Sequence, residues 1–146
     1  MIRIRGRQAW VWVAFEPGLR AFLAFRVSYN RSILDTHAFL KELRRRYGLK
    51  PIWTDEGTFY PEACRKYLRL EHHVYQTEWK NLIERMNQAL KDRLENFDDL
   101  FPCVKEDYDR EHVRIWISVF RFYHHHVRVN GEIGRAPMEY DGRPEC

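Results

Sequence analysis

Two acidic residues, Asp55 and Glu84, have the side chains and the sequence setting that metal-dependent chemistry needs. Asp55 directly follows residues 51–54, which predict a short strand, and Glu84 lies within residues 77–94, which predict an amphipathic helix. Carboxylate oxygens are the ligands that Mg²⁺ and Mn²⁺ prefer, and two such ions about 3.5–4 Å apart can support phosphodiester cleavage. We therefore expect the two carboxylates to lie within roughly 4–8 Å of each other and to share a metal site.

The helix predicted over residues 77–94 positions Glu84 beside a buried stripe. Its apolar residues recur at the spacing i, i+3, i+4, i+7: Trp79, Leu82, Ile83, Met86, Leu90 and Leu94. A second stripe is polar and contains Asn81, Glu84, Gln88 and Lys91. Glu84 is therefore expected to sit on a rigid helix and to face away from the interior. From the pattern alone, a solvated helix face for Glu84 and a turn or cap for Asp55 stay open as alternatives.

The other segments predict an α/β fold that starts with antiparallel strands and continues with strands linked by helices. Strands are expected at residues 1–5, 8–15, 21–27 and 72–75, with a hairpin turn at Pro17-Gly18. Helices are expected at about residues 33–47, 61–68 and 109–124, and a loop at 96–106. This order predicts a mixed five-stranded sheet, its first strand truncated, with helices on both faces.

The composition limits the classes of protein that the chain can represent. With 146 residues, of which 45% are hydrophobic and 15% aromatic, we expect one folded domain over residues 1–128 and a C-terminal tail over 129–146. No apolar run is long enough to span a membrane and no signal-peptide pattern is present, so no membrane partner is expected. Three widely spaced cysteines indicate free thiols and a cytoplasmic location. The net charge of +4 permits a polyanionic partner.

Four segments carry a pattern that matches one family. Asn81-Leu82-Ile83-Glu84 is followed by Lys91, seven residues after the Glu, and Thr54-Asp55 is followed by Tyr60 and Pro61. The first motif resembles the final acidic motif of DDE transposases, and the second resembles the segment around their second acid. Residues 2–6 with 10–17 are similar to the β-hairpin of small insertion-sequence transposases, and residues 123–140 to the closing segment of integrase-type cores. The resemblance is thus to the superfamily of DDE transposases and retroviral integrases.

This resemblance implies an RNase H-like fold and a catalytic core for DNA transposition, that is, metal-dependent DNA strand cleavage and joining. Asp55 and Glu84 would be the catalytic ligands of Mg²⁺ or Mn²⁺. DNA, as transposon ends and target, would contact side chains of the Glu84 helix: Lys91, Arg85, Asn81 and Gln88. A homo-oligomer, most simply a dimer, is the implied assembly.

The chain departs from the family pattern at its start. The family's first catalytic Asp lies just before the strand that matches residues 2–6, so we expect an incomplete fragment that lacks this acid, lacks a helix-turn-helix domain and is inactive or nearly so. Two alternatives stay open. One is a non-catalytic DNA-binding or oligomerising remnant of a transposase. The other is a different RNase H-like nuclease, such as a resolvase, in which Glu16 or Glu56 would supply a further acid.

Other groups could bind metal or DNA but have plainer interpretations. His72-His73 and His124-His125-His126 lack zinc-finger spacing, so polar or interface histidines are expected. The run 44–46 of three arginines suits either phosphates or a solvated helix end. Four tryptophans could stack on bases, but core packing is expected of them: Trp10, Trp12, Trp53 and Trp116.

Overall fold

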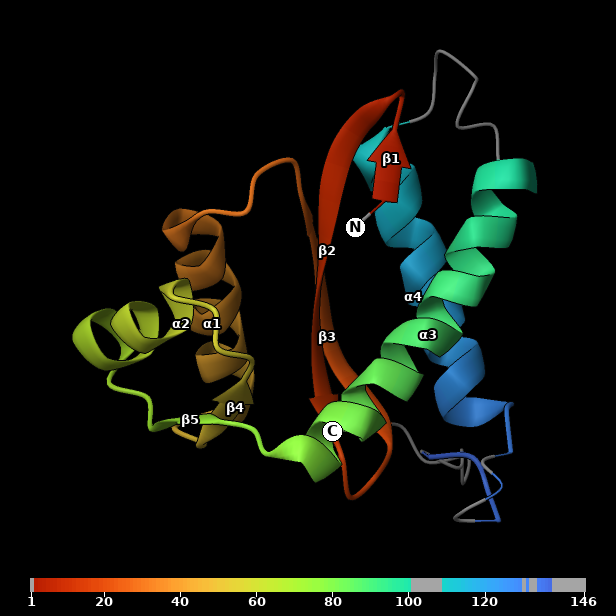
Figure 1. Ribbon diagram of the computed structural model, residues 1–146. Helices are drawn as coiled ribbons and strands as arrows, with labels where there is room; N and C mark the ends of the chain where they lie inside the picture. The colour runs from red at the N-terminus through yellow and green to blue at the C-terminus, as the bar shows by residue number, and fades with distance from the viewer. Residues whose placement is uncertain (1, 101–108, 130, 132–133, 138–146) are drawn as a thin grey trace.

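The computed structural model describes residues 2–100, 109–129, 131 and 134–137, and for residues 78 and 91–100 it describes the helix without the side chains (Figure 1). Of the predicted tail over 129–146, it therefore describes 129, 131 and 134–137, where Ala136 is buried. The domain boundary at residue 128 stays a prediction.

The first three strands form an antiparallel sheet in the order β1-β2-β3: β1 (Ile2–Ile4), β2 (Arg7–Glu16) and β3 (Ala21–Ser28). The turn between β1 and β2 needs positive φ, which Arg5 adopts at 51° and Gly6 at 71°. The hairpin predicted at Pro17-Gly18 is confirmed, and the Glu16 carboxylate closes it by accepting a hydrogen bond from the Leu19 N–H. Glu16 thus acts in the turn of the hairpin.

The prediction of one mixed five-stranded sheet is wrong. β4 (Ile52–Thr54) pairs in parallel with β5 (His72–Val74), and these two strands form a separate sheet. Among the described residues, no ladder joins them to β1–β3. The separation follows the packing: Ile52 of β4 packs against a cluster that contains Leu40, Cys64 and Leu68, which is distinct from the core over the β1–β3 sheet.

The helices agree with the sequence pattern except at their ends. α1 (Ile33–Tyr47) has the predicted bounds, with Ser32 as N-cap and Gly48 at φ 76° after its last turn. α2 (Phe59–Glu62) continues directly into the wider helix η1 (Ala63–Leu68), and α4 covers Arg110–His126. α3 (Thr77–Leu100) is longer than predicted, so the loop expected at 96–106 is wrong for residues 96–100. No Gly or Pro interrupts residues 77–100, so nothing in the backbone ends this helix early.

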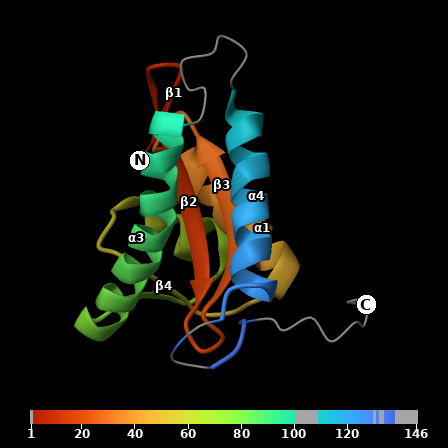
Figure 2. The same ribbon diagram turned by 90° about the vertical axis from the view of Figure 1, so that its right-hand side faces the viewer.

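The helices cover both faces of the β1–β3 sheet, as expected (Figures 1 and 2). α3 and α4 lie on one face, over a core that contains Ile4, Phe22, Ile117 and Phe120. α1 lies on the other face, where Phe39 packs against Trp12 and Ala24. A smaller apolar cluster joins α1 to η1 and the segment before β5: Leu40, Ala63, Cys64, Leu68 and Leu70.

Two buried histidines join the end of α4 to the start of β3. The Phe22 N–H donates to His125 Nε2 at 2.9 Å, and His124 Nε2 lies 2.9 Å from the Arg20 carbonyl oxygen, to which it donates. Burial, followed by the charges of Arg121 and the neighbouring histidines, lowers the pKa of His125 to about 4. The neutral imidazole is the form that can accept the amide bond. These histidines therefore have a structural role, in agreement with the plainer interpretation.

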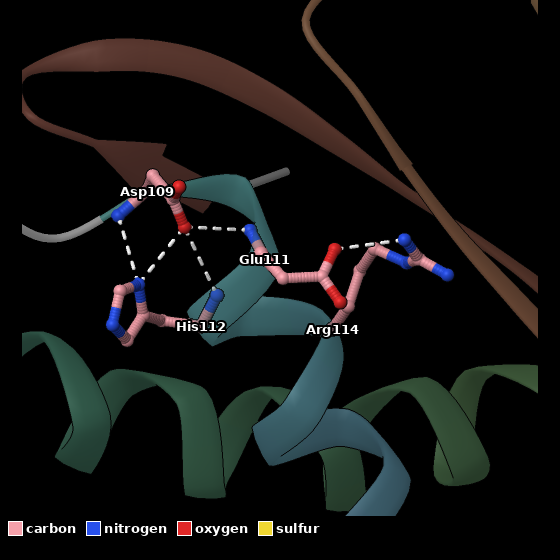
Figure 3. Close-up of polar contacts among 4 residues, drawn as sticks. All are labelled: Asp109, Glu111, His112 and Arg114. Atoms are coloured by element: carbon pink, nitrogen blue, oxygen red, sulfur yellow. Dashed lines mark hydrogen bonds and ion pairs between the residues drawn. The ribbon is translucent and has the colours of Figure 1, made fainter.

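The start of α4 is fixed by a reciprocal cap (Figure 3). Asp109 Oδ1 accepts hydrogen bonds from the backbone N–H groups of Glu111 and His112, at 2.8 and 3.2 Å. His112 Nδ1 accepts in return from the Asp109 N–H at 3.3 Å. One turn further, Arg114 pairs with Glu111 at 2.8 Å.

Candidate functional site

Asp55 lies at the C-terminal edge of the two-stranded parallel sheet. It directly follows β4, and Tyr75 directly follows β5 at the same edge, because parallel strands end on the same side. The Tyr75 N–H donates to the Thr54 carbonyl oxygen at 3.0 Å, which fixes the two strand ends together. The predicted position of Asp55 at a strand end is confirmed.

The Asp55 carboxylate is held by two contacts. Oδ1 accepts a hydrogen bond from the Gly57 N–H at 3.1 Å, and Oδ2 lies 3.7 Å from Nη2 of Arg31. A Cβ at Gly57 would lie 2.9 Å from Oδ1 and 3.1 Å from the Tyr60 ring, so this turn has no room for a side chain. The Asp55 side chain is 48% exposed and that of Arg31 41%, so a ligand from solvent can reach both.

Two tyrosines lie within the field of this carboxylate. Burial first, and then the charge of Asp55, raise the pKa of Tyr60 to about 12, against a lowering by Arg31. Burial also raises the pKa of Tyr75, and the charges of Asp55 and Glu84 raise it further. Both carboxylates therefore disfavour ionisation of the Tyr75 hydroxyl. We call Asp55, Arg31, Tyr60 and Tyr75 the carboxylate rim.

Glu84 lies on the exposed face of α3, as the helical spacing predicts. Asn81, Arg85 and Gln88 are exposed on the same helix, and the side chain of Lys91 lies outside the described residues. The predicted apolar stripe holds for Leu90, which is buried. Leu82, Ile83 and Met86 are half-buried. The stripe is wrong at Trp79, which is 46% exposed because the first turn of α3 precedes the part of the helix that packs on the core.

Sequence reasoning missed the residues that surround Asp55. Arg31 lies in the segment before α1, 24 positions from Asp55, and no spacing rule links them. Tyr75 was expected only as the end of a strand. Gly57 had a usable signal, since an Asp with a Gly two residues later is typical of a turn that the Asp side chain closes.

The donor chemistry of this edge suits a hard divalent cation, but with few ligands. Asp55 at this edge, and Glu84 on α3, carry carboxylate oxygens, which Mg²⁺ and Mn²⁺ prefer, and their expected separation of roughly 4–8 Å stays a prediction. In the part of the chain that the structure describes, no three His, Cys, Asp or Glu residues form a group that could hold a metal ion. Glu56 is exposed beside Asp55, and Glu16 is engaged in the hairpin turn. The resolvase alternative, which needs a further converging acid, therefore gains no support from the described residues.

Comparison with known proteins gives one relative by sequence and several by structure. No family model matches the chain. The uncharacterized protein MJ0017 of Methanocaldococcus jannaschii is 29% identical over 128 residues, which are 87% of this chain and 58% of that protein. The chain thus spans less than two thirds of the length of this relative.

None of the helices, as far as the structure describes them, combines the length and the hydrophobicity of a membrane-spanning segment.

Two solved structures have a similar fold. A chain of the simian T-cell lymphotropic virus intasome, in complex with PP2A regulatory subunit B56 gamma, matches with a TM-score of 0.69 and 16% identity, over 92% of this chain and 48% of that one. The HTLV-2 integrase catalytic core domain, in complex with magnesium in a trimeric form, matches with a TM-score of 0.56 and 18% identity, over 87% of this chain and 79% of that one. The chain therefore has a mixed α/β fold that resembles a retroviral integrase catalytic core.

Proposed function

We propose that the chain is the catalytic core of an insertion-sequence DNA transposase, in which Asp55 and Glu84 hold Mg²⁺ or Mn²⁺ for DNA strand cleavage and joining. The observation that carries this proposal is the exposure of two carboxylates, Asp55 directly after β4 and Glu84 on α3, whose charges both raise the pKa of Tyr75. The integrase-like fold supports it, and one solved structure with that fold is a magnesium complex. A bound cation would supply charge that stabilises the phosphodiester during cleavage.

The remaining parts of the proposal concern DNA and assembly. Asn81, Arg85 and Gln88 are exposed on the same helix as Glu84, so DNA that reached Glu84 would pass along them. Lys91, seven residues after Glu84, would contact the backbone by the family pattern. Assembly of two or more copies is part of the proposal, since the similar structures are an intasome and a trimeric form.

Metal binding gives the direct test. Mn²⁺ is titrated into the chain and followed by electron paramagnetic resonance, for the wild type and for Asp55→Asn and Glu84→Gln. Each variant should weaken binding by at least about 10-fold, the cost reported even for partners outside the ligand shell. Glu62→Gln removes a matched exposed carboxylate from α2 and should leave the affinity unchanged. Unchanged affinity in Glu84→Gln would contradict a shared site.

Tyr75 gives a second readout of the same site. Its pKa is raised partly by the charges of Asp55 and Glu84, so a cation that neutralises them should lower it. The shift is measured from tyrosinate absorbance as the difference between wild type and Tyr75→Phe, with and without Mn²⁺. A Tyr75 pKa that Mn²⁺ leaves unchanged would place the ion elsewhere.

A non-catalytic, DNA-binding remnant is a second candidate, favoured by one observation. The Arg31 guanidinium lies 3.7 Å from Asp55, where it repels a cation that approaches the carboxylate. Since the described residues offer two carboxylates and no group of three, plasmid nicking by the purified chain in Mg²⁺ should be absent or very slow. Nicking that depends on Mg²⁺ and disappears in Glu84→Gln would establish the enzyme and exclude the remnant.

A further inference from the structure

An open groove of about 490 Å³ runs along β3, the edge strand of the three-stranded sheet that lies opposite β1. Its walls come from β3, α1 and α4, and Figure 2 shows α4 alongside β3 with α1 behind. None of its lining residues belongs to β4, β5 or α3. The groove is therefore separate from the carboxylate rim and from Glu84.

The groove concentrates positive charge. Five arginines line it, and we call them the arginine groove: Arg26, Arg46, Arg110, Arg114 and Arg121. Glu42 is the one carboxylate among the lining residues. The excess of four positive charges equals the formal net charge of the whole chain, +4. The formal charges of all residues outside the groove lining therefore sum to zero.

Carboxylates of the chain neutralise only part of this charge. Arg46 pairs with Glu42, and Arg114 pairs with Glu111. Within the described residues, Arg26, Arg110 and Arg121 have no carboxylate at ion-pair distance. In addition, Arg26 Nε is shielded from solvent without a hydrogen-bond partner among the described residues. A shielded donor of this kind costs free energy unless a ligand satisfies it.

The arginines of α4 form a row that suits a repeating anion. Arg110, Arg114 and Arg121 are separated by 4 and 7 positions, so at 100° per residue they lie within about 40° of one another around the helix axis. At 1.5 Å per residue the row is about 16 Å long, close to five base pairs of duplex DNA at 3.4 Å each. Guanidinium groups can also bind phosphate through two parallel hydrogen bonds.

We propose that the arginine groove binds the phosphodiester backbone of duplex DNA, as a second contact surface away from the carboxylate rim. It binds without base specificity, since arginines that meet phosphates carry no sequence information. The groove is open and its α4 arginines extend over about 16 Å, which suits a continuous strand of phosphates better than a single phosphate group. This binding needs no metal ion and no chemistry at Asp55 or Glu84.

The test compares two triple variants of equal charge. Arg110→Gln, Arg114→Gln and Arg121→Gln together remove three charges from the groove, and Arg3→Gln, Arg45→Gln and Arg65→Gln remove three exposed charges outside it. Affinity for a labelled 20-base-pair duplex of arbitrary sequence is measured by fluorescence anisotropy without divalent cations, over a range of salt. The groove variant should lose at least about 10-fold in affinity, and its plot of log affinity against log salt should flatten by up to about three units of slope.

The control variant should stay within about threefold of wild type, with an unchanged salt slope. Equal losses in the two variants, or no loss in the groove variant, would overturn the proposal. Circular dichroism of each variant checks that the fold is intact, and Arg121→Gln alone should reproduce about one unit of slope if the triple variant unfolds. Displacement of the duplex by polyglutamate at equal charge concentration would also overturn it, because the groove would then bind any polyanion. All readouts are metal-free, so failure of the proposed catalytic function leaves them unaffected.

Discussion

The carboxylate rim and the arginine groove present charge to solvent in opposite ways. At the rim, Asp55 already has a guanidinium 3.7 Å away, so its charge is partly balanced before any ligand arrives. In the groove, carboxylates pair with two of the five arginines, and Arg26, Arg110 and Arg121 have no ion-pair partner among the described residues. The two surfaces are therefore suited to different ligands. In our proposals, a small cation at the rim would compete with Arg31, whereas an anion with several charges would bind in the groove.

Loss of the aromatic packing between β3 and α4, beneath the groove, should reduce the stability of the chain most. Phe22 is fully buried on β3 and contacts Phe120 and His124 of α4, so Phe22→Ala should cost about 3–5 kcal/mol of unfolding free energy. Urea denaturation measures the loss, and DNA binding should disappear with the fold. The matched control is Phe122→Ala, which lines the groove but is 62% exposed and should cost less than about 0.5 kcal/mol. A stable Phe22→Ala variant with normal DNA affinity would show that the groove does not depend on this packing.

The second prediction is that the stability of the chain depends on pH through His125, which lines the groove. The folded chain holds the pKa of His125 at about 4, below its usual 6.5, so between these values the unfolded chain binds the extra proton first. Stability should therefore be full above pH 6.5 and fall as the pH drops toward 4, by up to about 1.4 kcal/mol per pH unit. His125→Gln can still accept the Phe22 amide bond but cannot titrate, so its stability should vary less with pH.

Carboxylates titrate in the same range, so the comparison of wild type with His125→Gln isolates the imidazole. His37→Gln, on α1, provides a matched loss of a histidine and controls for the substitution itself. If stability depended on pH equally in wild type and His125→Gln, His125 would take up a proton as readily in the folded chain as in the unfolded chain. The hydrogen bond to Phe22 would then have to be reassigned.

The smallest effect is at the rim. Arg31→Gln removes the cation beside Asp55, so Mn²⁺ should bind up to about fivefold more tightly, in line with the 0.2–1 kcal/mol of an exposed ion pair. Arg45→Gln, an exposed arginine on α1, is the control for the change in net charge. Weaker Mn²⁺ binding in Arg31→Gln would indicate that Arg31 holds Asp55 in its binding position. An arginine would then support ligand binding at both surfaces, and this contrast between them would be lost.

The two surfaces also differ in how much of each the sequence could predict. The position of Asp55 follows from a three-residue strand next to it, and the exposed face of Glu84 follows from helical spacing, so local pattern sufficed for both. The turn at Pro17-Gly18 and the bounds of α1 were predictable for the same reason.

What the sequence could not predict depends on contacts between distant segments. The groove takes Arg26 from β3, Arg46 from α1 and three arginines from α4, and only the packing of these elements brings them together. The division of the strands into two sheets was missed because it depends on which strands pair with each other, and strand pairing depends on contacts between distant segments. The pairing of Arg31 with Asp55 likewise crosses between elements.

The hydrogen bond from the Phe22 amide to His125 spans 103 positions of the chain. During synthesis, β3 leaves the ribosome before α4, so this hydrogen bond cannot form until the chain has emerged as far as His125. Contacts of such long range form late and slow the assembly of a domain. Until then the edge of β3 is open to other strands, so this protein should be most prone to aggregate while it is being made.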